Sequence, residues 1–191
     1  MGRRWAACLL LALALVGCAA KETERAEEIA QKYAALEGYS AEVKIDVPRE
    51  EETLRYALAL RGDGEETRVC VREPEELADV TAILRADTLS LSYDGLVLDA
   101  GSLAPRVTAV NAVPLLLRAV AEGYVCEESA ERLGDTPALR VRIEAPLEGE
   151  TLQYTVFFSD QDVPLYAEIA QEDKIILFME FTNFTFDDII S

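Results

Sequence analysis

Apolar and polar residues alternate with a period of two along most of the chain after residue 40. This pattern is typical of β-strands that have one covered face. Asp94-Gly95 stands between two alternating segments and predicts a tight hairpin turn. A single helical turn is expected at 74–77, where proline comes first. The pattern predicts about 9–11 strands, with runs at 41–47, 54–60, 69–71, 81–84, 89–93, 96–98, 139–143, 152–158, 166–170 and 175–186.

The last run differs from the others because both of its faces are apolar. Ile175, Leu177, Met179 and Phe181 would lie on one face, and Ile176, Phe178 and Phe184 on the other. A strand that is apolar on both faces is usually covered on both. We therefore expect the final strand to lie between two layers.

Two segments have the longer period of a helix. In residues 22–36, apolar residues at positions 29, 33 and 36 make one stripe among charges, and Gly38 ends the segment. Residues 111–122 form the second helix, with Asn111 as its cap, Pro114 in its first turn and Gly123 after its end. This second helix is apolar on nearly every side, which predicts that it is covered on most sides.

The order of these elements predicts an α+β fold built on one strongly curved antiparallel sheet. A helix comes first, several strands follow, then the apolar helix, then more strands. We expect the sheet to form an open half-barrel, with the apolar helix in its concave face. No internal repeat or linker divides the chain, so residues 24–191 are expected to form a single domain.

The N-terminus has the pattern of a removable signal. Arg3 and Arg4 precede an apolar run of twelve residues, 5–16, which is shorter than the ~20 residues of a spanning helix. Leu15-Val16-Gly17-Cys18 resembles the bacterial lipobox, in which the cysteine receives a diacylglyceryl group and becomes the mature N-terminus. The resemblance implies a signal peptide at 1–17, a lipidated tether at 18–23 and an extracytoplasmic domain anchored to the membrane through Cys18. The alternative is a secreted protein in which Cys18 is incidental.

The chain is strongly acidic, with 18 Lys and Arg against 36 Asp and Glu and a net charge of −18. Loss of residues 1–17 would remove two arginines and no acid. The charge would then become −20, from −18 minus 2. Such a charge excludes nucleic acid as a partner and disfavours direct binding of the domain to anionic lipid. A basic partner surface and simple solubility both remain open.

The candidate chemistry is sparse, because the chain contains no histidine. Triads that use histidine and the commonest metal sites are therefore excluded, and a cysteine nucleophile would lack its usual base. The acids are better explained as solvated faces, and Asp160 and Asp162 as a turn. We expect no enzymatic activity, no cofactor and no metal. Cys70 and Cys126 could pair, but two separate thiols are favoured.

Four motifs, taken in order, carry a family resemblance. They are RVCVREPE at 68–75, LSYDGLVL at 91–98, FSDQDVPLY at 158–166 and FTNFTF at 181–186. Together they resemble the LolA/LolB-like lipoprotein-binding fold over most of residues 24–187. With the lipobox, and with Tyr93-Asp94-Gly95 followed by Gly101-Ser102-Leu103, the chain looks most like the germination lipoprotein (GerS-type) branch of spore-forming clostridia.

Two functions are compatible with this resemblance. The first is a non-catalytic accessory lipoprotein that binds another envelope protein, which the GerS-type resemblance implies to be a spore-cortex peptidoglycan amidase. The second is a carrier whose concave face holds acyl chains. The discriminating feature is an apolar hollow of several hundred Å³, which only the carrier needs. Leu115, Leu116, Val120 and the strand 175–181 could instead fill it, and the sequence favours the accessory function.

Overall fold

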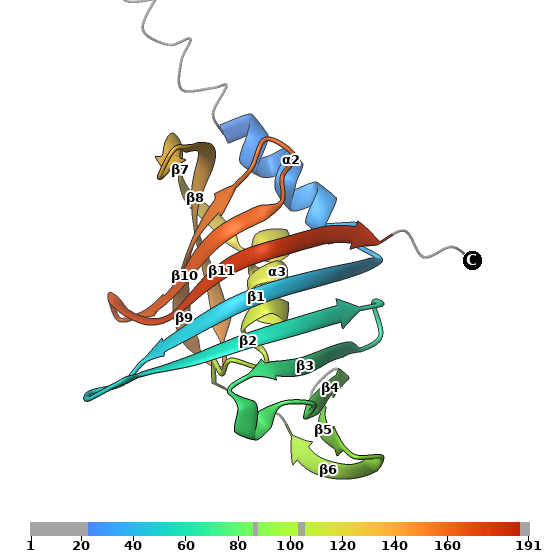
Figure 1. Cartoon of the computed structure of the whole chain (residues 1–191). Helices are drawn as coiled ribbons and strands as arrows, with labels where there is room; N and C mark the ends of the chain where they lie inside the picture. The colour runs from blue at the N-terminus through green and yellow to red at the C-terminus, as the bar shows by residue number, and fades with distance from the viewer. Residues whose placement is uncertain (1–22, 86–87, 103–105, 188–191) are drawn as a thin grey trace, which may run out of the picture.

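The computed structural model describes residues 23–85, 88–102 and 106–187 and contains one antiparallel sheet of eleven strands (Figure 1). The strand order is β6-β5-β4-β3-β2-β1-β11-β10-β9-β8-β7, so the first and last halves of the chain meet where β1 pairs with β11. The predicted α+β fold class, a curved and unclosed antiparallel sheet with two helices, is confirmed. The strands are β1 (Gly38–Pro48), β2 (Thr53–Gly62), β3 (Thr67–Glu73), β4 (Thr81–Arg85), β5 (Thr88–Tyr93), β6 (Leu96–Ser102), β7 (Tyr124–Leu133), β8 (Thr136–Leu147), β9 (Glu150–Phe158), β10 (Pro164–Gln171) and β11 (Lys174–Asp187).

Helix α3 (Ala112–Glu122) lies in the concave face of the sheet, as expected (Figure 1). Val113, Leu116, Leu117 and Val120 are buried at helical spacing, and the same cluster contains inward-facing residues of the strands. Every buried residue of this cluster lies between Ala26 and Phe184. The core of the described residues therefore begins in α2, at Ala26.

Helix α2 (Thr23–Ala34) closes one end of the half-barrel and ends two residues earlier than Leu36, the last position of its predicted stripe. Arg25 and Lys32 each reach the Asp162 carboxylate at 3.3 Å. The Tyr33 hydroxyl donates a hydrogen bond to the Asp162 carbonyl at 2.9 Å. These contacts hold α2 on the 159–162 turn. Exposed pairs of this kind contribute roughly 0–1 kcal/mol each, so buried Ile29 and Tyr33 supply most of the attachment.

Strand β7 has no counterpart among the predicted elements. Its sequence, YVCEESAERL, does not alternate, because it is an edge strand with most of its residues exposed or half-buried. The 3-10 helix η2 (Glu75–Leu77) and the Asp94-Gly95 turn, in contrast, occur where the sequence predicts them. Alternation arises when one face of a strand is covered, and β7 has little covered surface, so its sequence does not alternate.

The prediction for the two faces of β11 is wrong in two ways. Phe184 lies in the core with Phe181, because a bulge between the pairs Glu42↔Asn183 and Val43↔Phe181 shifts the side-chain alternation by one residue. Ile176 and Phe178 are only half-buried, so the second face is not covered like the first. Tyr166 packs beside Phe178 on this convex face, with ring centroids 6.5 Å apart.

Cys70 and Cys126 are both free thiols, as the sequence favours. Cys70 is half-buried on β3, an interior strand, and Cys126 is exposed on β7, an edge strand of the sheet. Neither of the two described helices is sufficiently long and apolar to span a bilayer. Cys18, and with it the predicted signal peptide and most of the tether, lies outside the described residues.

Candidate functional site

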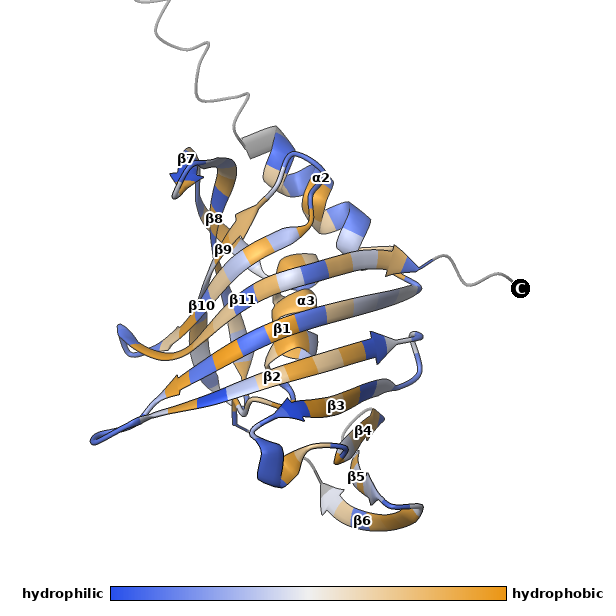
Figure 2. Cartoon of the chain, in the orientation of Figure 1, coloured by the Kyte–Doolittle hydropathy of each residue, from blue (hydrophilic) through white to orange (hydrophobic). Residues whose placement is uncertain are grey.

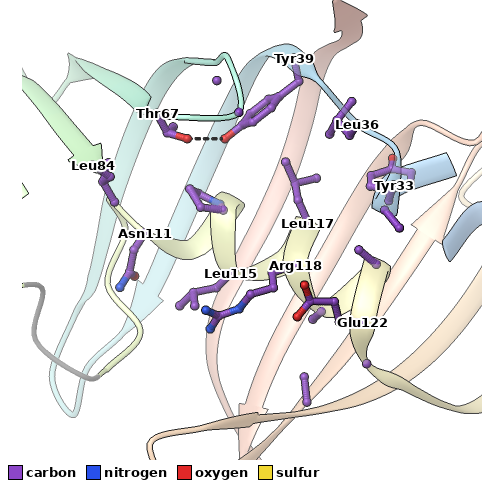
Figure 3. Close-up of a pocket in the computed structure, with 18 of the residues that line it drawn as sticks. Tyr33, Leu36, Tyr39, Thr67, Leu84, Asn111, Leu115, Leu117, Arg118 and Glu122 are labelled. Atoms are coloured by element: carbon purple, nitrogen blue, oxygen red, sulfur yellow. Dashed lines mark hydrogen bonds between the residues drawn. The ribbon is translucent and has the colours of Figure 1, made fainter. Parts of the chain in front are cut away.

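The concave face contains an open cleft of about 1000 Å³ beside α3. Its walls come from both halves of the sheet, with β1, β2, β3 and β4 on one side and β8 and β9 on the other. The end of α2 and the loop before α3 complete it (Figure 3). The predicted filling of the hollow by α3 is therefore incomplete: Leu116 and Val120 are buried in the core, but Leu115 lines open space.

The floor of the cleft is apolar. Residues from six elements contribute to it, so no single stretch of the sequence identifies it. They are Tyr33, Leu36, Tyr39, Leu84, Pro114, Leu115, Leu117, Ala121, Leu147 and Tyr154.

Tyr39 owes its position on this floor to a glycine on the neighbouring strand. Tyr39 on β1 pairs with Gly62 on β2, and a Cβ atom at residue 62 would lie 2.2 Å from the tyrosine ring. No other residue type leaves room for that ring. The sequence suggests only a turn at 62–64. The turn is present, and the Asp63 carboxylate accepts hydrogen bonds from the backbone amides of Glu65 and Glu66.

Burial raises the pKa of the tyrosines around the cleft. The pKa of Tyr39 rises to about 12 because its ring is buried, and a hydrogen bond with the Thr67 hydroxyl at 3.3 Å opposes part of that rise. The pKa of Tyr154 also rises to about 12 through burial, against a lowering by the nearby Arg118. Burial raises the pKa of Tyr33 as well, and the charge of Asp162 adds to this effect. All three hydroxyls are therefore neutral at physiological pH.

Alkaline pH is expected to destabilise the domain through these groups. The unfolded chain releases a tyrosine proton near pH 10 and the native state only near pH 12, so stability is complete below pH 10 and is lost as the pH rises toward 12. Ionisation of each of Tyr39 and Tyr154 would lower the free energy of unfolding by on the order of 2 kcal/mol. Urea unfolding at pH 9 and pH 11 measures this loss, and Tyr39→Phe should reduce it. An equal loss in the wild type and in a Tyr39→Phe/Tyr154→Phe variant would contradict the assignment.

The rim of the cleft is charged, unlike its floor. Figure 3 shows Arg118 and Glu122 of α3 side by side at the opening. Glu66, across the cleft on the loop before β3, pairs with Arg68 at 2.6 Å and also with Arg85. Glu37, Glu65, Arg106 and Glu148 complete the rim. An apolar floor with a charged rim can hold a molecule that is itself apolar at one end and polar at the other.

Asn111 fixes one end of the cleft, but not in the predicted way. Its side chain does not cap α3. Instead, its carbonyl oxygen accepts hydrogen bonds from the Thr108 amide at 2.8 Å and the Thr108 hydroxyl at 3.0 Å, and its amide donates to the Arg106 carbonyl at 3.0 Å. The residue is 7% exposed, so these bonds satisfy a buried polar group. They order the loop that leads into α3.

Gly123 ends α3, as predicted, but for a steric reason. Its backbone is extended, with φ at −74°, so a left-handed conformation is not what requires glycine. A Cβ atom there would lie 2.4 Å from both the Ala119 carbonyl oxygen and an Ile143 methyl group. The glycine therefore lets the end of α3 rest directly on β8, close to the cleft.

The described residues bring together no cluster of acids and cysteines that could hold a metal ion. The carboxylate of Asp162 is instead shared by Arg25 and Lys32. Cys18, the one site residue that the sequence predicts, lies outside the described residues. The cleft is the candidate binding site of the described structure. The sequence predicts such a hollow only for the carrier function, which is the less favoured of the two.

Solved structures with low sequence identity share this architecture. A DUF1329 family protein from Desulfovibrio piger matches with a TM-score of 0.52 and 10% identity over 89% of this chain and 95% of that chain. An uncharacterized conserved protein from Thermus thermophilus matches with a TM-score of 0.52 and 13% identity over 86% of this chain and 89% of that chain. The LolA superfamily protein NE2245 from Nitrosomonas europaea gives a TM-score of 0.47 and 12% identity, over 86% and 94%.

The first two matches show a shared fold, and their low identity transfers no activity to this chain. A scan against protein-family models finds no match, and neither does a search of curated proteins. The first two structural matches therefore support, at the level of the fold alone, the curved antiparallel architecture expected from the sequence. The GerS-type branch is a finer assignment that these comparisons do not reach.

Proposed function

We propose that the chain is a non-catalytic, membrane-anchored extracytoplasmic lipoprotein that binds an acyl lipid or the acyl chains of a lipoprotein in its concave face. The cleft of about 1000 Å³ is the observation that supports this proposal most. Ligand sites are commonly clefts of ≈ 300–1,000 Å³ with an apolar lining and few polar groups. The sequence favours the accessory function, and the size of this cleft moves the balance to the carrier.

The apolar floor and charged rim of the cleft suit an amphiphilic ligand, which has one apolar and one polar end. Acyl chains would lie against Leu115, Leu117 and Leu84 on the floor. Burial of each CH₂ group contributes ~0.8 kcal/mol, so a long chain gains substantial affinity from the floor alone. A polar or charged headgroup would remain at the rim, near Arg106 and Arg118. The neutral hydroxyls of Tyr39 and Tyr154 keep the floor free of charge.

A binding assay with a cleft-filling variant tests this function. The soluble domain, from residue 21 onward, should extract a fluorescent acyl lipid from vesicles in a saturable way. Leu115→Trp places an indole in the open cleft and is expected to weaken extraction at least tenfold. Leu77→Trp is the matched control, because Leu77 is exposed on η2 and does not line the cleft. Equal extraction by both variants, or none by the wild type, would contradict the proposal.

Protein binding is a second candidate function, and a different surface favours it. The hairpin of β5 and β6 exposes several large apolar side chains at one edge of the sheet. Under the GerS-type resemblance the partner would be a spore-cortex peptidoglycan amidase, which the lipoprotein would support. Adding the soluble domain to such an amidase should raise its hydrolysis of cortex peptidoglycan, whereas the domain alone should hydrolyse none.

A further inference from the structure

The β5–β6 hairpin continues the concave apolar surface beyond the part that α3 covers. Leu91 on β5 pairs with the core residue Ala82 on one side and with Leu98 on the other, so these residues share the concave face. Tyr93 pairs with Leu96 in the same way. Leu96 and Leu98 are 70% and 67% exposed, which shows that no described element covers this end of the face. Figure 2 shows the hydrophobic residues of β6 at the end of the half-barrel opposite α2.

The two edges of the sheet are protected very differently. At one edge, β7 carries three acids and an arginine, and Glu127 pairs with Arg140 at 3.1 Å and with Arg142 at 3.0 Å. Charges on an edge strand discourage pairing with another chain. At the other edge, β6 has the sequence LVLDAGS and a single charge, Asp99. In the described structure β6 pairs only with β5, so half of its backbone groups have no strand partner.

The hairpin turn indicates which backbone groups face outward. Asp94 and Gly95 have φ values of 49° and 78°, the signature of a two-residue type I′ turn. In such a hairpin the residues that flank the turn share backbone hydrogen bonds, and the next residue on each strand points its amide and carbonyl away. Tyr93 and Leu96 flank this turn, so the backbone groups of Val97 face the open edge.

We propose that β6 accepts an extended, basic segment of another protein as a twelfth strand of the sheet. This inference rests on protein binding, the second candidate function, and not on the cleft. A β-strand added to an open edge gains main-chain hydrogen bonds for affinity and side-chain pockets for specificity. Alternate apolar residues of the added strand would cover Leu96 and Leu98 on the concave face, and the basic residues between them would lie beside Val97, 64% exposed, on the other face.

Two other occupants are disfavoured by the same features. A bilayer would leave the outward backbone groups of β6 unsatisfied in hydrocarbon, at a cost of several kcal/mol each. A second copy of this chain would bring a net charge of −18 against −18. Residues 88–102 contain Asp94 and Asp99 but no lysine or arginine, so a basic segment gains attraction where an acidic one is repelled.

The test uses the soluble domain from residue 21 onward, which contains every core residue that the structure describes, and a synthetic peptide of alternating lysine and valine. Saturable binding is expected at 50 mM salt and should weaken at least fivefold at 300 mM. Methylation of every second peptide amide on the pairing side, or replacement of lysine by glutamate, should abolish it. Binding that is equal for the lysine and glutamate peptides would overturn the proposal.

Substitutions in β6 separate edge pairing from other modes of peptide binding. Val97→Pro removes the outward amide and should weaken peptide binding at least tenfold, whereas Val97→Thr keeps that amide and should stay within twofold. Leu96→Lys/Leu98→Lys should also weaken binding while leaving the melting temperature unchanged, because both leucines are exposed. Leu115→Trp, the cleft variant, should bind the peptide normally. Equal peptide binding by Val97→Pro and wild type, or a wild-type dimer that Val97→Pro dissociates, would overturn the proposal.

Discussion

Replacing Leu116 with aspartate is expected to unfold the domain or to lower its free energy of unfolding by roughly 3–5 kcal/mol. Leu116 is 0% exposed in the middle of α3, where it packs among the inward-facing residues of the sheet. The substitution removes a large apolar side chain and leaves a carboxylate in a space that offers it no partner. Thermal unfolding followed by circular dichroism measures the effect.

Arg118→Asp is the matched control, since it introduces the same side chain two residues later on the exposed face of α3. Its melting temperature should stay within a few degrees of the wild type. Leu116→Met, which conserves volume, should cost less than about 1.5 kcal/mol. A Leu116→Asp variant that melts like Arg118→Asp would mean that α3 does not lie in the concave face.

The fold was predictable where one face of an element is covered and the other is not. β1, with Val43 and Ile45 buried between exposed Glu42 and Lys44, alternates for that reason. α3 was predictable because it is buried on most of its surface. β7 was missed because an edge strand beside charged partners has little to bury. The bulge that returns Phe184 to the core depends on the register of β1 against β11, which local sequence does not record.

The cleft was less predictable than the fold, because its lining is assembled from distant parts of the chain. Tyr39 and Gly62 pair across two strands, while Tyr154 and Leu147 come from the other half of the sheet. The sequence does show the large residues that could fill the hollow, but not whether they do. Leu115 and Leu116 are neighbours of the same type, and only the direction of α3 separates a cleft-lining residue from a core residue. Gly62, which leaves room for the Tyr39 ring, is the one cleft position that the sequence marks, and it marks that position only as part of a turn.

Replacing Cys18 with serine is expected to move the protein from the membrane fraction to the soluble fraction almost completely. The lipobox-like Leu15-Val16-Gly17-Cys18 predicts that the Cys18 sulfur carries a diacylglyceryl group, and only four residues separate Cys18 from α2. Two acyl chains anchor a protein stably where one does not. The acidic domain gives no electrostatic help at an anionic membrane, so loss of the lipid should remove the main attachment. Fractionation of a bacterial host after a high-salt wash, combined with metabolic labelling by a radioactive fatty acid, measures both consequences.

Cys126→Ser is the matched control, because Cys126 is an exposed free thiol in the folded domain, and it should keep both the label and the membrane location. A Cys18→Ser protein that remains on washed membranes and still carries the label would place the lipid elsewhere. A wild-type protein without label would contradict the lipoprotein assignment itself.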